Sequence, residues 1–167
     1  MIRFIIWTVM LFGGAGLGFY LDSIFFPGIH HNLMFHIVSF VFGVPLLRTV
    51  LVVSRNTGRI LAKYGREGDI PRMETNRLVS EGPYRLMRHP MHLGLLFFPL
   101  AFALLIGSPS FVFIIAPAEA LFMLLMIAIV EEPGARKKFG AKYKRYAKGK
   151  PWFCLKNECI KELFNNV

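Results

Sequence analysis

Long apolar stretches alternate with polar, mostly basic stretches along this chain. The apolar stretches cover residues 2–21, 33–53, 91–107 and 111–130. Each is close to the roughly 20 residues that an α-helix needs to cross the hydrocarbon core of a bilayer. The pattern therefore predicts an all-α integral membrane protein with four transmembrane helices, built as a single domain over residues 1–167.

The first apolar stretch is interpreted as part of the fold and not as a signal peptide. It is longer than the hydrophobic region of a signal peptide, no small-x-small cleavage site follows it, and further apolar stretches come after it. Within it, Gly14 and Gly18 form a small-xxx-small face, which favours close helix packing in lipid. A nucleotide-binding glycine loop is disfavoured because no strand precedes these glycines.

Two polar segments flank the later apolar stretches. Residues 54–89 form the most polar part of the chain, and a connection of this length predicts a loop with a functional role. After the fourth stretch, Phe139, Tyr143 and Tyr146 recur at helical spacing among Lys and Arg. This pattern predicts a C-terminal amphipathic helix at the membrane interface.

The charged residues lie mainly in the polar segments between and after the apolar stretches. The formal net charge is +10, and the basic residues concentrate in two blocks, residues 55–88 and 136–161, each beside an apolar stretch. This position favours anionic lipid headgroups over nucleic acid as the partner. The positive-inside rule places both blocks and Arg3 on the cytoplasmic side and residues 22–32 and 107–110, which lack Lys and Arg, on the other side. An even number of crossings satisfies all these assignments.

Neither the cysteines nor the histidines predict a metal site. Cys154 and Cys159 lie in a tail expected to be cytoplasmic, where a disulfide is disfavoured, so both are expected to be free thiols. His30 and His31 lie in an external loop with only Asp22 as an acidic companion.

Chemically versatile side chains concentrate where the polar loop meets the third apolar stretch. Arg85 and Arg88 can pair with a carboxylate, and His89 can donate or accept a hydrogen bond. Pro90 is a favoured first residue of a helix, whose N-terminus attracts anions. The alternative is that these basic residues only extend to lipid headgroups.

Two glutamates, Glu131 and Glu132, stand where the fourth apolar stretch ends. A hairpin of the third and fourth crossings is expected to return them to Arg88 and His89. Cationic donors and anionic acceptors beside an apolar wedge suit a zwitterionic, partly apolar ligand with a positive centre, and S-adenosylmethionine has this chemistry. The alternative interpretation is that the glutamates only compensate a helix dipole.

These motifs resemble those of the isoprenylcysteine carboxyl methyltransferase and phospholipid methyltransferase superfamily. The resemblance covers roughly the C-terminal half of the chain. Its motifs are Leu78-Val79, Gly82-Pro83-Tyr84, Arg88-His89-Pro90, Glu131-Glu132, Phe139-Gly140 and Tyr143. It implies a cytoplasmic S-adenosylmethionine site on residues 76–94 and 131–146, and methyl transfer to a lipidic or membrane-dissolved amine, thiol, phenol or carboxylate.

The resemblance also implies which residues contact the cofactor. They are Asn76, Arg77, Leu78, Val79, Tyr84, His89, Pro90, Met91, His92 and Glu131. Transfer is expected by in-line displacement at the sulfonium methyl, with donor and acceptor held in line and water excluded. Arg88, Glu132 and His92 are the candidate catalytic residues, and Glu132 or His92 is the base that an amine acceptor requires.

The chain departs from the family pattern at two positions. His92 stands where members usually have Tyr after Arg-His-Pro-x. Ile127 stands one turn before Glu131, where isoprenylcysteine-specific members place an Arg that holds the substrate carboxylate. This absence argues against a prenylcysteine substrate, unless Arg136 supplies the missing charge.

Two other functions remain open at this point. Sterol reductases resemble this family in their C-terminal half, so a membrane reductase with a nicotinamide cofactor is one alternative, although such enzymes have more crossings. A non-catalytic membrane scaffold of the same fold is the other. Glu119, inside the fourth apolar stretch, is an ionisable residue in the membrane with either a functional or a packing role, and His36 or Arg48 is its expected partner.

Overall fold

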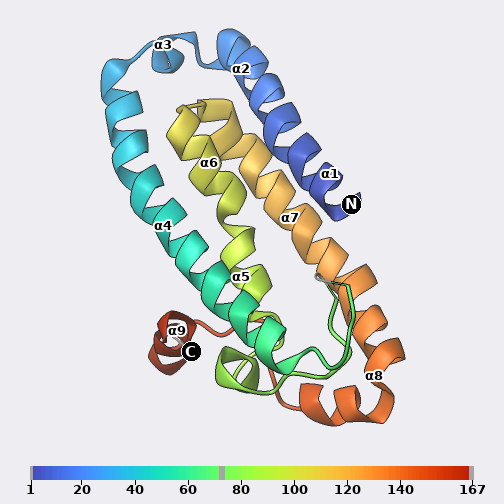
Figure 1. Ribbon diagram of the computed structural model, residues 1–167. Coiled ribbons are helices and arrows are strands. Elements are labelled where there is room, and N and C mark those ends of the chain that lie inside the picture. The colour runs from blue at the N-terminus through green and yellow to red at the C-terminus, as the bar shows by residue number, and fades with distance from the viewer. Residues whose placement is uncertain (1, 72–73, 166–167) are drawn as a thin grey trace. The chain divides into compact units, whose positions relative to one another are not determined.

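The computed structural model describes residues 2–71 and 74–165, and every regular element in these ranges is a helix (Figure 1). Residues 1, 72–73 and 166–167, which belong to the predicted domain and its loop, lie outside the described residues. The prediction of an all-α chain is confirmed for the described part. The chain forms two compact units: unit 1 is Met1–Val50 and Leu96–Leu125, and unit 2 is Leu51–Leu95 and Met126–Val167.

Within the described residues, three helices are long and apolar enough to cross a membrane. They are Ile5–Phe25, Leu33–Tyr64 and Phe111–Ala147. The third predicted crossing, residues 91–107, corresponds to a shorter apolar stretch, Pro90–Ile106. This stretch is divided at Phe97 into α5 (Pro90–Leu96) and α6 (Phe98–Ile106).

Unit 1 is built from the N-terminal helices and from the middle of the chain. Its elements are α1 (Ile2–Thr8), η1 (Val9–Gly13), α2 (Gly14–Phe25), α3 (Pro27–His30), the first part of α4 (Leu33–Tyr64), α6, η3 (Phe111–Ile115) and α7 (Ala116–Met126). The segments labelled η1 and η3 are π-helical, and α2 lies beside η3.

Two glycines allow α2 to lie close to η3. A Cβ atom at Gly18 would lie 2.7 Å from Ser108 Oγ and 3.2 Å from Phe111 Cβ, and one at Gly14 would lie 3.0 Å from Phe111 Cζ. Phe111 is fully buried, in a cluster with Ala103, Ile115 and Ala116. The predicted small-xxx-small packing face is therefore confirmed.

Polar contacts complete unit 1. The fully buried Asp22 accepts a hydrogen bond through Oδ1 from the backbone N–H of Ser110 at 2.6 Å, which satisfies a donor at the start of η3. Ser39 Oγ donates to the carbonyl oxygen of Leu104 at 2.7 Å and so joins α4 to α6. These bonds connect segments far apart in the sequence.

We expect opposite effects from adding a methyl group at two glycines of α2. Gly18→Ala should destabilise the protein by about 1–3 kcal/mol, because the new Cβ overlaps Ser108 and Phe111. Gly16→Ala is the matched control, since no atom lies within 4 Å of its Cβ position, and it should stabilise the helix by up to about 1 kcal/mol. Unfolding in detergent measures both changes, and equal effects would contradict the packing described here.

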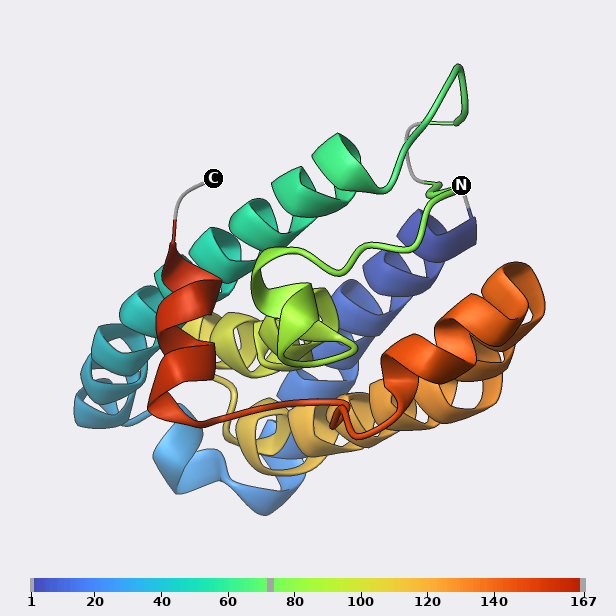
Figure 2. The same cartoon turned by 90° about the horizontal axis from the view of Figure 1, so that it is seen from below.

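Unit 2 contains the rest of α4, the loop that follows it, and the C-terminal elements. These are η2 (Gly82–Arg85), most of α5, η4 (Ile127–Glu131), α8 (Glu132–Ala147) and α9 (Asn157–Phe164). The last helix, α9, lies beside α4 (Figure 2). Asn56 Nδ2 donates to the carbonyl oxygen of Leu163 at 3.2 Å, and Cys159 and Leu163 pack with Val53 and Met87 in one buried cluster.

Two features of the C-terminal region differ from expectation. Cys154 and Cys159 form a disulfide, so the prediction of two free thiols is wrong. The predicted helix after residue 131 forms as α8, but Gly140 has φ 54° and ψ −127° and bends it. Tyr143 then faces the interior of unit 2 and is buried. An amphipathic helix lying in the membrane interface is not confirmed.

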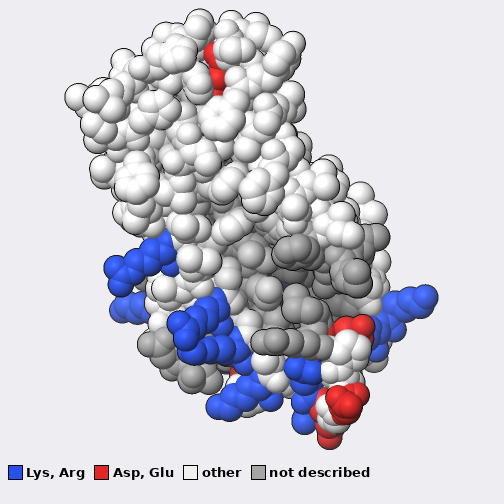
Figure 3. All heavy atoms as spheres, turned by 45° about the horizontal axis from the view of Figure 1, so that its top comes forward, with Lys and Arg blue, Asp and Glu red and all other residues white. Residues whose placement is uncertain are grey.

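Basic residues are unevenly distributed between the units. All Lys and Arg residues except Arg3 and Arg48 belong to unit 2. Figure 3 shows Lys and Arg side chains clustered on part of the visible face, and a large part of that face has no charged side chain.

Candidate functional site

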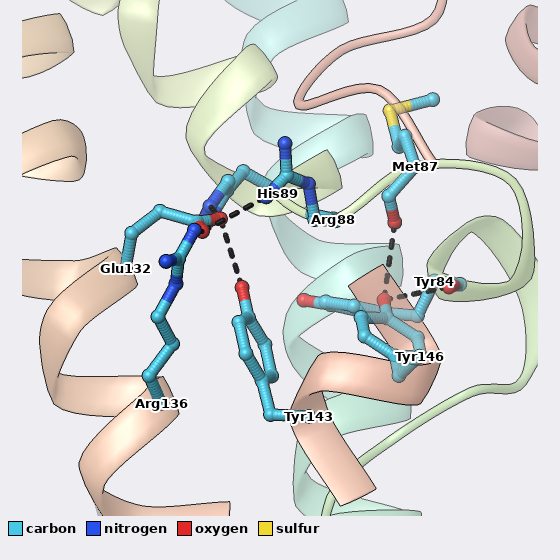
Figure 4. Close-up of polar contacts among 8 residues, drawn as sticks. All are labelled: Tyr84, Met87, Arg88, His89, Glu132, Arg136, Tyr143 and Tyr146. Carbon is cyan, nitrogen blue, oxygen red and sulfur yellow. Dashed lines mark hydrogen bonds and ion pairs between the residues drawn. The ribbon is translucent and has the colours of Figure 1, made fainter. Parts of the chain in front are cut away.

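The centre of the site is Glu132, a carboxylate with 4% exposure at the start of α8. Arg88 Nη1 donates to Oε2 at 2.8 Å, and Tyr143 Oη donates to Oε1 at 2.8 Å. His89 Nε2 lies 2.8 Å from Oε1. Because a carboxylate only accepts hydrogen bonds, His89 carries its proton on Nε2. The three donors converge on one carboxylate (Figure 4), and the predicted meeting of Glu132 with Arg88 and His89 is confirmed.

Local sequence explains how these side chains are presented. His89 precedes Pro90, and a residue before proline is restricted to extended conformations. The backbone N–H of Arg88 donates to the carbonyl oxygen of Pro151 at 3.0 Å. The backbone N–H of His89 donates to the carbonyl oxygen of Trp152 at 3.1 Å. Residues 88–89 therefore pair with a C-terminal segment immediately before α5 begins.

Burial governs the protonation of His89. Removal from water lowers the pKa of its imidazole below the ordinary value, and the hydrogen bond to Glu132 opposes this shift only partly. A neutral imidazole that donates from Nε2 is consistent with the hydrogen bond described above. Arg88 stays the permanent cation of the cluster, and its guanidinium lies 5.8 Å from the centre of the Trp152 ring.

A second group of contacts surrounds Tyr84. Tyr146 Oη donates to the carbonyl oxygen of Tyr84 at 2.7 Å, and Lys150 Nζ donates to the same oxygen at 3.2 Å. Lys150 also lies 3.8 Å from the centre of the Tyr146 ring. Burial raises the pKa of the Tyr84 phenol and lowers the pKa of the Lys150 amine. Tyr84 is thus held in place through its backbone, while its side chain enters the buried interior.

Two buried polar atoms of the site have no hydrogen-bond partner within residues 2–71 and 74–165. They are Tyr84 Oη and Arg88 Nε. An unsatisfied buried donor costs about 1–3 kcal/mol, so such atoms need a particular explanation. A ligand with polar groups of its own provides one.

The predicted cofactor residues in the loop fall into two groups. Val79 is buried with Ile60 and Tyr84 in one cluster, whereas Asn76 and Arg77 are exposed. Asn76 Nδ2 donates to the carbonyl oxygen of Glu67 at 2.6 Å and stabilises the loop itself. The structure therefore brings the Val79 end of this segment to Tyr84 and assigns Asn76 a local contact.

The remaining predicted residues lie at the ends of helices. Pro90 is buried, and Met91 and His92 are partly buried in the first turn of α5. The His92 ring centre lies 5.4 Å from that of His89. Glu131 is the last residue of η4 and is partly buried.

The two positions relevant to a substrate carboxylate differ in exposure. Ile127 is almost fully buried, with 1% exposure. The side chain of Arg136 is 61% exposed, and its Nη2 lies 3.7 Å from Glu132 Oε2. Arg136 is therefore the accessible cation nearest to the buried carboxylate along α8.

The sequence did not indicate Lys150 and Trp152 as parts of this site, and it included Tyr146 only within the range 131–146, without a role. The regular spacing of aromatic residues after Glu132 was interpreted as a membrane-facing pattern, and nothing in a single sequence distinguishes that pattern from an inward-facing one. The dipeptide Pro151-Trp152 lies beyond all the motifs considered. Its contacts with Arg88 and His89 depend on the course of the chain after α8.

Comparison with known proteins places this arrangement in a family. The phospholipid methyltransferase family model matches residues 38–142, more than half of the chain. The chain belongs to the phospholipid methyltransferase family. The match begins within α4, farther toward the N-terminus than the motifs that first suggested it, and the resemblance inferred from those motifs is confirmed. It includes Arg88, His89 and Glu132 but ends before Tyr143.

One curated relative supports the same placement. The chain is 27% identical over 133 residues to Protein-S-isoprenylcysteine O-methyltransferase B of Arabidopsis thaliana. The match covers 78% of this chain and 64% of the relative, so the chain spans less than two thirds of that protein's length. Among solved structures, none matches the chain significantly.

Tyr143 provides a test of the site's role in stability. Tyr143→Phe removes one hydrogen bond to a buried carboxylate and should destabilise the protein by about 1.5–3 kcal/mol. Tyr64→Phe is the matched control, because Tyr64 is 38% exposed at the end of α4, and it should have little effect. The two unfolding midpoints in detergent are compared, and an unchanged midpoint for Tyr143→Phe would show that Glu132 does not need this donor.

Proposed function

We propose that this protein is an S-adenosylmethionine-dependent methyltransferase that acts on a lipidic or membrane-dissolved acceptor. The observation that carries the proposal is the buried Glu132 carboxylate with its donors Arg88 and His89, in a chain of the phospholipid methyltransferase family. This cluster places charged groups next to helices that are apolar enough for a membrane. A methyl donor with charged ends and an apolar acceptor need that combination.

The chemistry of the residues fits this cofactor. Tyr84 Oη and Arg88 Nε, which are buried and have no hydrogen-bond partner in the described part of the chain, offer hydrogen bonds to a polar ligand. Arg88 also provides a positive charge for a carboxylate, and Glu131 a negative charge for an ammonium group. The proposed cofactor residues remain Asn76, Arg77, Leu78 and Val79, then Tyr84, the segment from His89 to His92, and Glu131.

The protein's own contribution is positioning and proton handling. When bound, S-adenosylmethionine supplies an electrophilic methyl group on its sulfonium. Hydrogen bonds to Glu132 hold the side chains of Arg88 and His89 in position. The aromatic face of Tyr84 favours a positive centre beside it. For an amine acceptor, His92 or Glu132 takes up the released proton, and the partly buried His92 is the more available because Glu132 already accepts three hydrogen bonds. Exclusion of water keeps the acceptor unsolvated.

We also propose a single membrane domain with four crossings, in which Pro90–Ile106 is the shortest. Its length of 17 residues is at the lower limit for a span. The basic residues gathered in unit 2 then lie on the cytoplasmic side together with the site, as the positive-inside rule requires.

The identity of the acceptor is the finer part of the proposal. The curated relative is named for isoprenylcysteine, whose reacting group is a carboxylate. In this chain Ile127 is buried and uncharged, and Arg136 is the accessible cation near Glu132. We therefore favour an apolar acceptor with a neutral thiol, phenol or amine over one with a carboxylate.

Cofactor binding tests the enzyme class. Tyr84→Phe removes a buried hydroxyl that has no partner among the residues the structure describes. It should therefore leave stability unchanged or slightly improved while weakening S-adenosylmethionine binding roughly five- to tenfold, or about 1–1.4 kcal/mol. Calorimetry on detergent-purified protein measures the binding, and Tyr64→Phe serves as the control. Binding of reduced nicotinamide cofactor alone would select a reductase, and binding of neither would leave a scaffold.

Acceptor preference is tested with two probes that share one chain, farnesyl thiol and N-acetyl-S-farnesylcysteine. Transfer of labelled methyl to the thiol should exceed transfer to the carboxylate by at least about tenfold, because Ile127 is uncharged and Arg88 is assigned to the carboxylate of the cofactor. Arg136→Gln controls for the exposed alternative. Efficient carboxylate methylation that survives Arg136→Gln would overturn the acceptor assignment.

A further inference from the structure

Glu119 is a buried carboxyl group that the proposed methyltransferase site does not use. It lies on α7 in unit 1, inside the helical span Phe111–Ala147, with 9% exposure. Its Oε2 is buried and makes no hydrogen bond within the described part of the chain. The expected pairing with His36 or Arg48 is not found there, and His36 Nε2 instead lies 2.7 Å from the carbonyl oxygen of His30.

An apolar groove within unit 1 lies next to this carboxyl. It is widely open to its surroundings, its volume is about 450 Å³, and Glu119 is part of its lining. The other lining side chains are apolar and come from two sides, among them Met10 and Leu17 on one and Ile114 and Phe122 on the other.

The Glu119 carboxyl lies close to the backbone of α2 at Gly14. A Cβ atom at Gly14 would lie 2.9 Å from Glu119 Oε1 and 3.0 Å from Phe111 Cζ, so a larger residue at this position would require the carboxyl to shift. The chain thus accommodates an ionisable group inside a span, and one of its oxygens has no hydrogen-bond partner among the described residues. Ionisable residues in such a position are costly, and they are by default functional.

We propose that this groove binds a membrane-dissolved chain molecule with one terminal hydroxyl group, and that the hydroxyl donates a hydrogen bond to the Glu119 carboxyl. The apolar lining takes the chain, and a turn of the carboxyl about its soft terminal torsion brings Oε2 to the donor. The occupant comes from the bilayer, because the elements that line the groove belong to the spans Ile5–Phe25 and Phe111–Ala147.

The lining of the groove disfavours anionic and ammonium headgroups. A phosphate or carboxylate would meet the Glu119 carboxyl with no cation in the groove to offset the repulsion. An ammonium group has three donors, and the groove offers a single acidic side chain among apolar ones. A single hydroxyl is the donor that this lining satisfies without leaving other polar atoms unpaired.

The test uses two probes that differ only in the donor, hexadecanol and hexadecyl methyl ether. Glu119 in detergent-purified protein is labelled with dicyclohexylcarbodiimide, an apolar reagent for carboxyl groups, and the labelled peptide is quantified by mass spectrometry. Hexadecanol should reduce the labelling of Glu119 several-fold, and the ether should not. Asp22 is an internal control, because it is a buried carboxylate of the same unit that already accepts a hydrogen bond from Ser110.

A binding measurement on variants makes the test independent of the label. In native mass spectrometry, Glu119→Gln, which keeps a carbonyl acceptor, should retain hexadecanol, whereas Glu119→Leu should bind alcohol and ether equally. Unchanged S-adenosylmethionine binding by both variants would show that they are folded and would separate this site from the methyltransferase site.

Three results would overturn the proposal. Equal protection by alcohol and ether would mean that the groove selects only apolar bulk. Absence of protection by either would mean that no chain molecule enters it. Loss of labelling as protein concentration rises, without added probe, would identify a second copy of the chain as the occupant.

Discussion

The burial of one carboxylate, Glu132, is the constraint on which unit 2 depends. Its hydrogen-bond donors come from the end of the loop, at Arg88 and His89, and from Tyr143 on α8. Removing the carboxylate would leave Arg88 as a poorly compensated cation, which is far more costly than the loss of an exposed ion pair. The same bonds fix the donors themselves, so stability and site geometry are not separable in this region.

The sequence was sufficient for the helices and for the core of the site, and the reasons are physical. In apolar runs of bilayer length, the backbone must satisfy its own hydrogen bonds, which favours a helix. The motif around Arg88 precedes Pro90, the first residue of α5. The division of the third run was not foreseen, although Pro99 supplies a cause. Proline has no N–H and its ring clashes with the preceding turn, so the helix is interrupted at Phe97 and resumes as α6.

Other features depend on the course of the chain and on the environment, which a single sequence does not specify. Helical spacing correctly put Phe139, Tyr143 and Tyr146 into a helix, but it did not say which face turns inward; the positive φ of Gly140 bends α8, and Tyr143 lies inside. The disulfide was not predicted because a cytoplasmic compartment disfavours disulfides, whereas the 5.8 Å between the Cα atoms of Cys154 and Cys159 lies within the range that a disulfide requires.

The backbone pairing of residues 88–89 with Pro151 and Trp152 has a consequence for biosynthesis. Ribosomes make the chain from the N-terminus, so the partners of Arg88 and His89 emerge only after every apolar helix has been synthesised. Before that moment the backbone N–H groups of Arg88 and His89 lack these acceptors. Insertion of the helices into the bilayer therefore precedes completion of the site, and a nascent chain that stops early has its spans in place without the backbone pairing at residues 88–89.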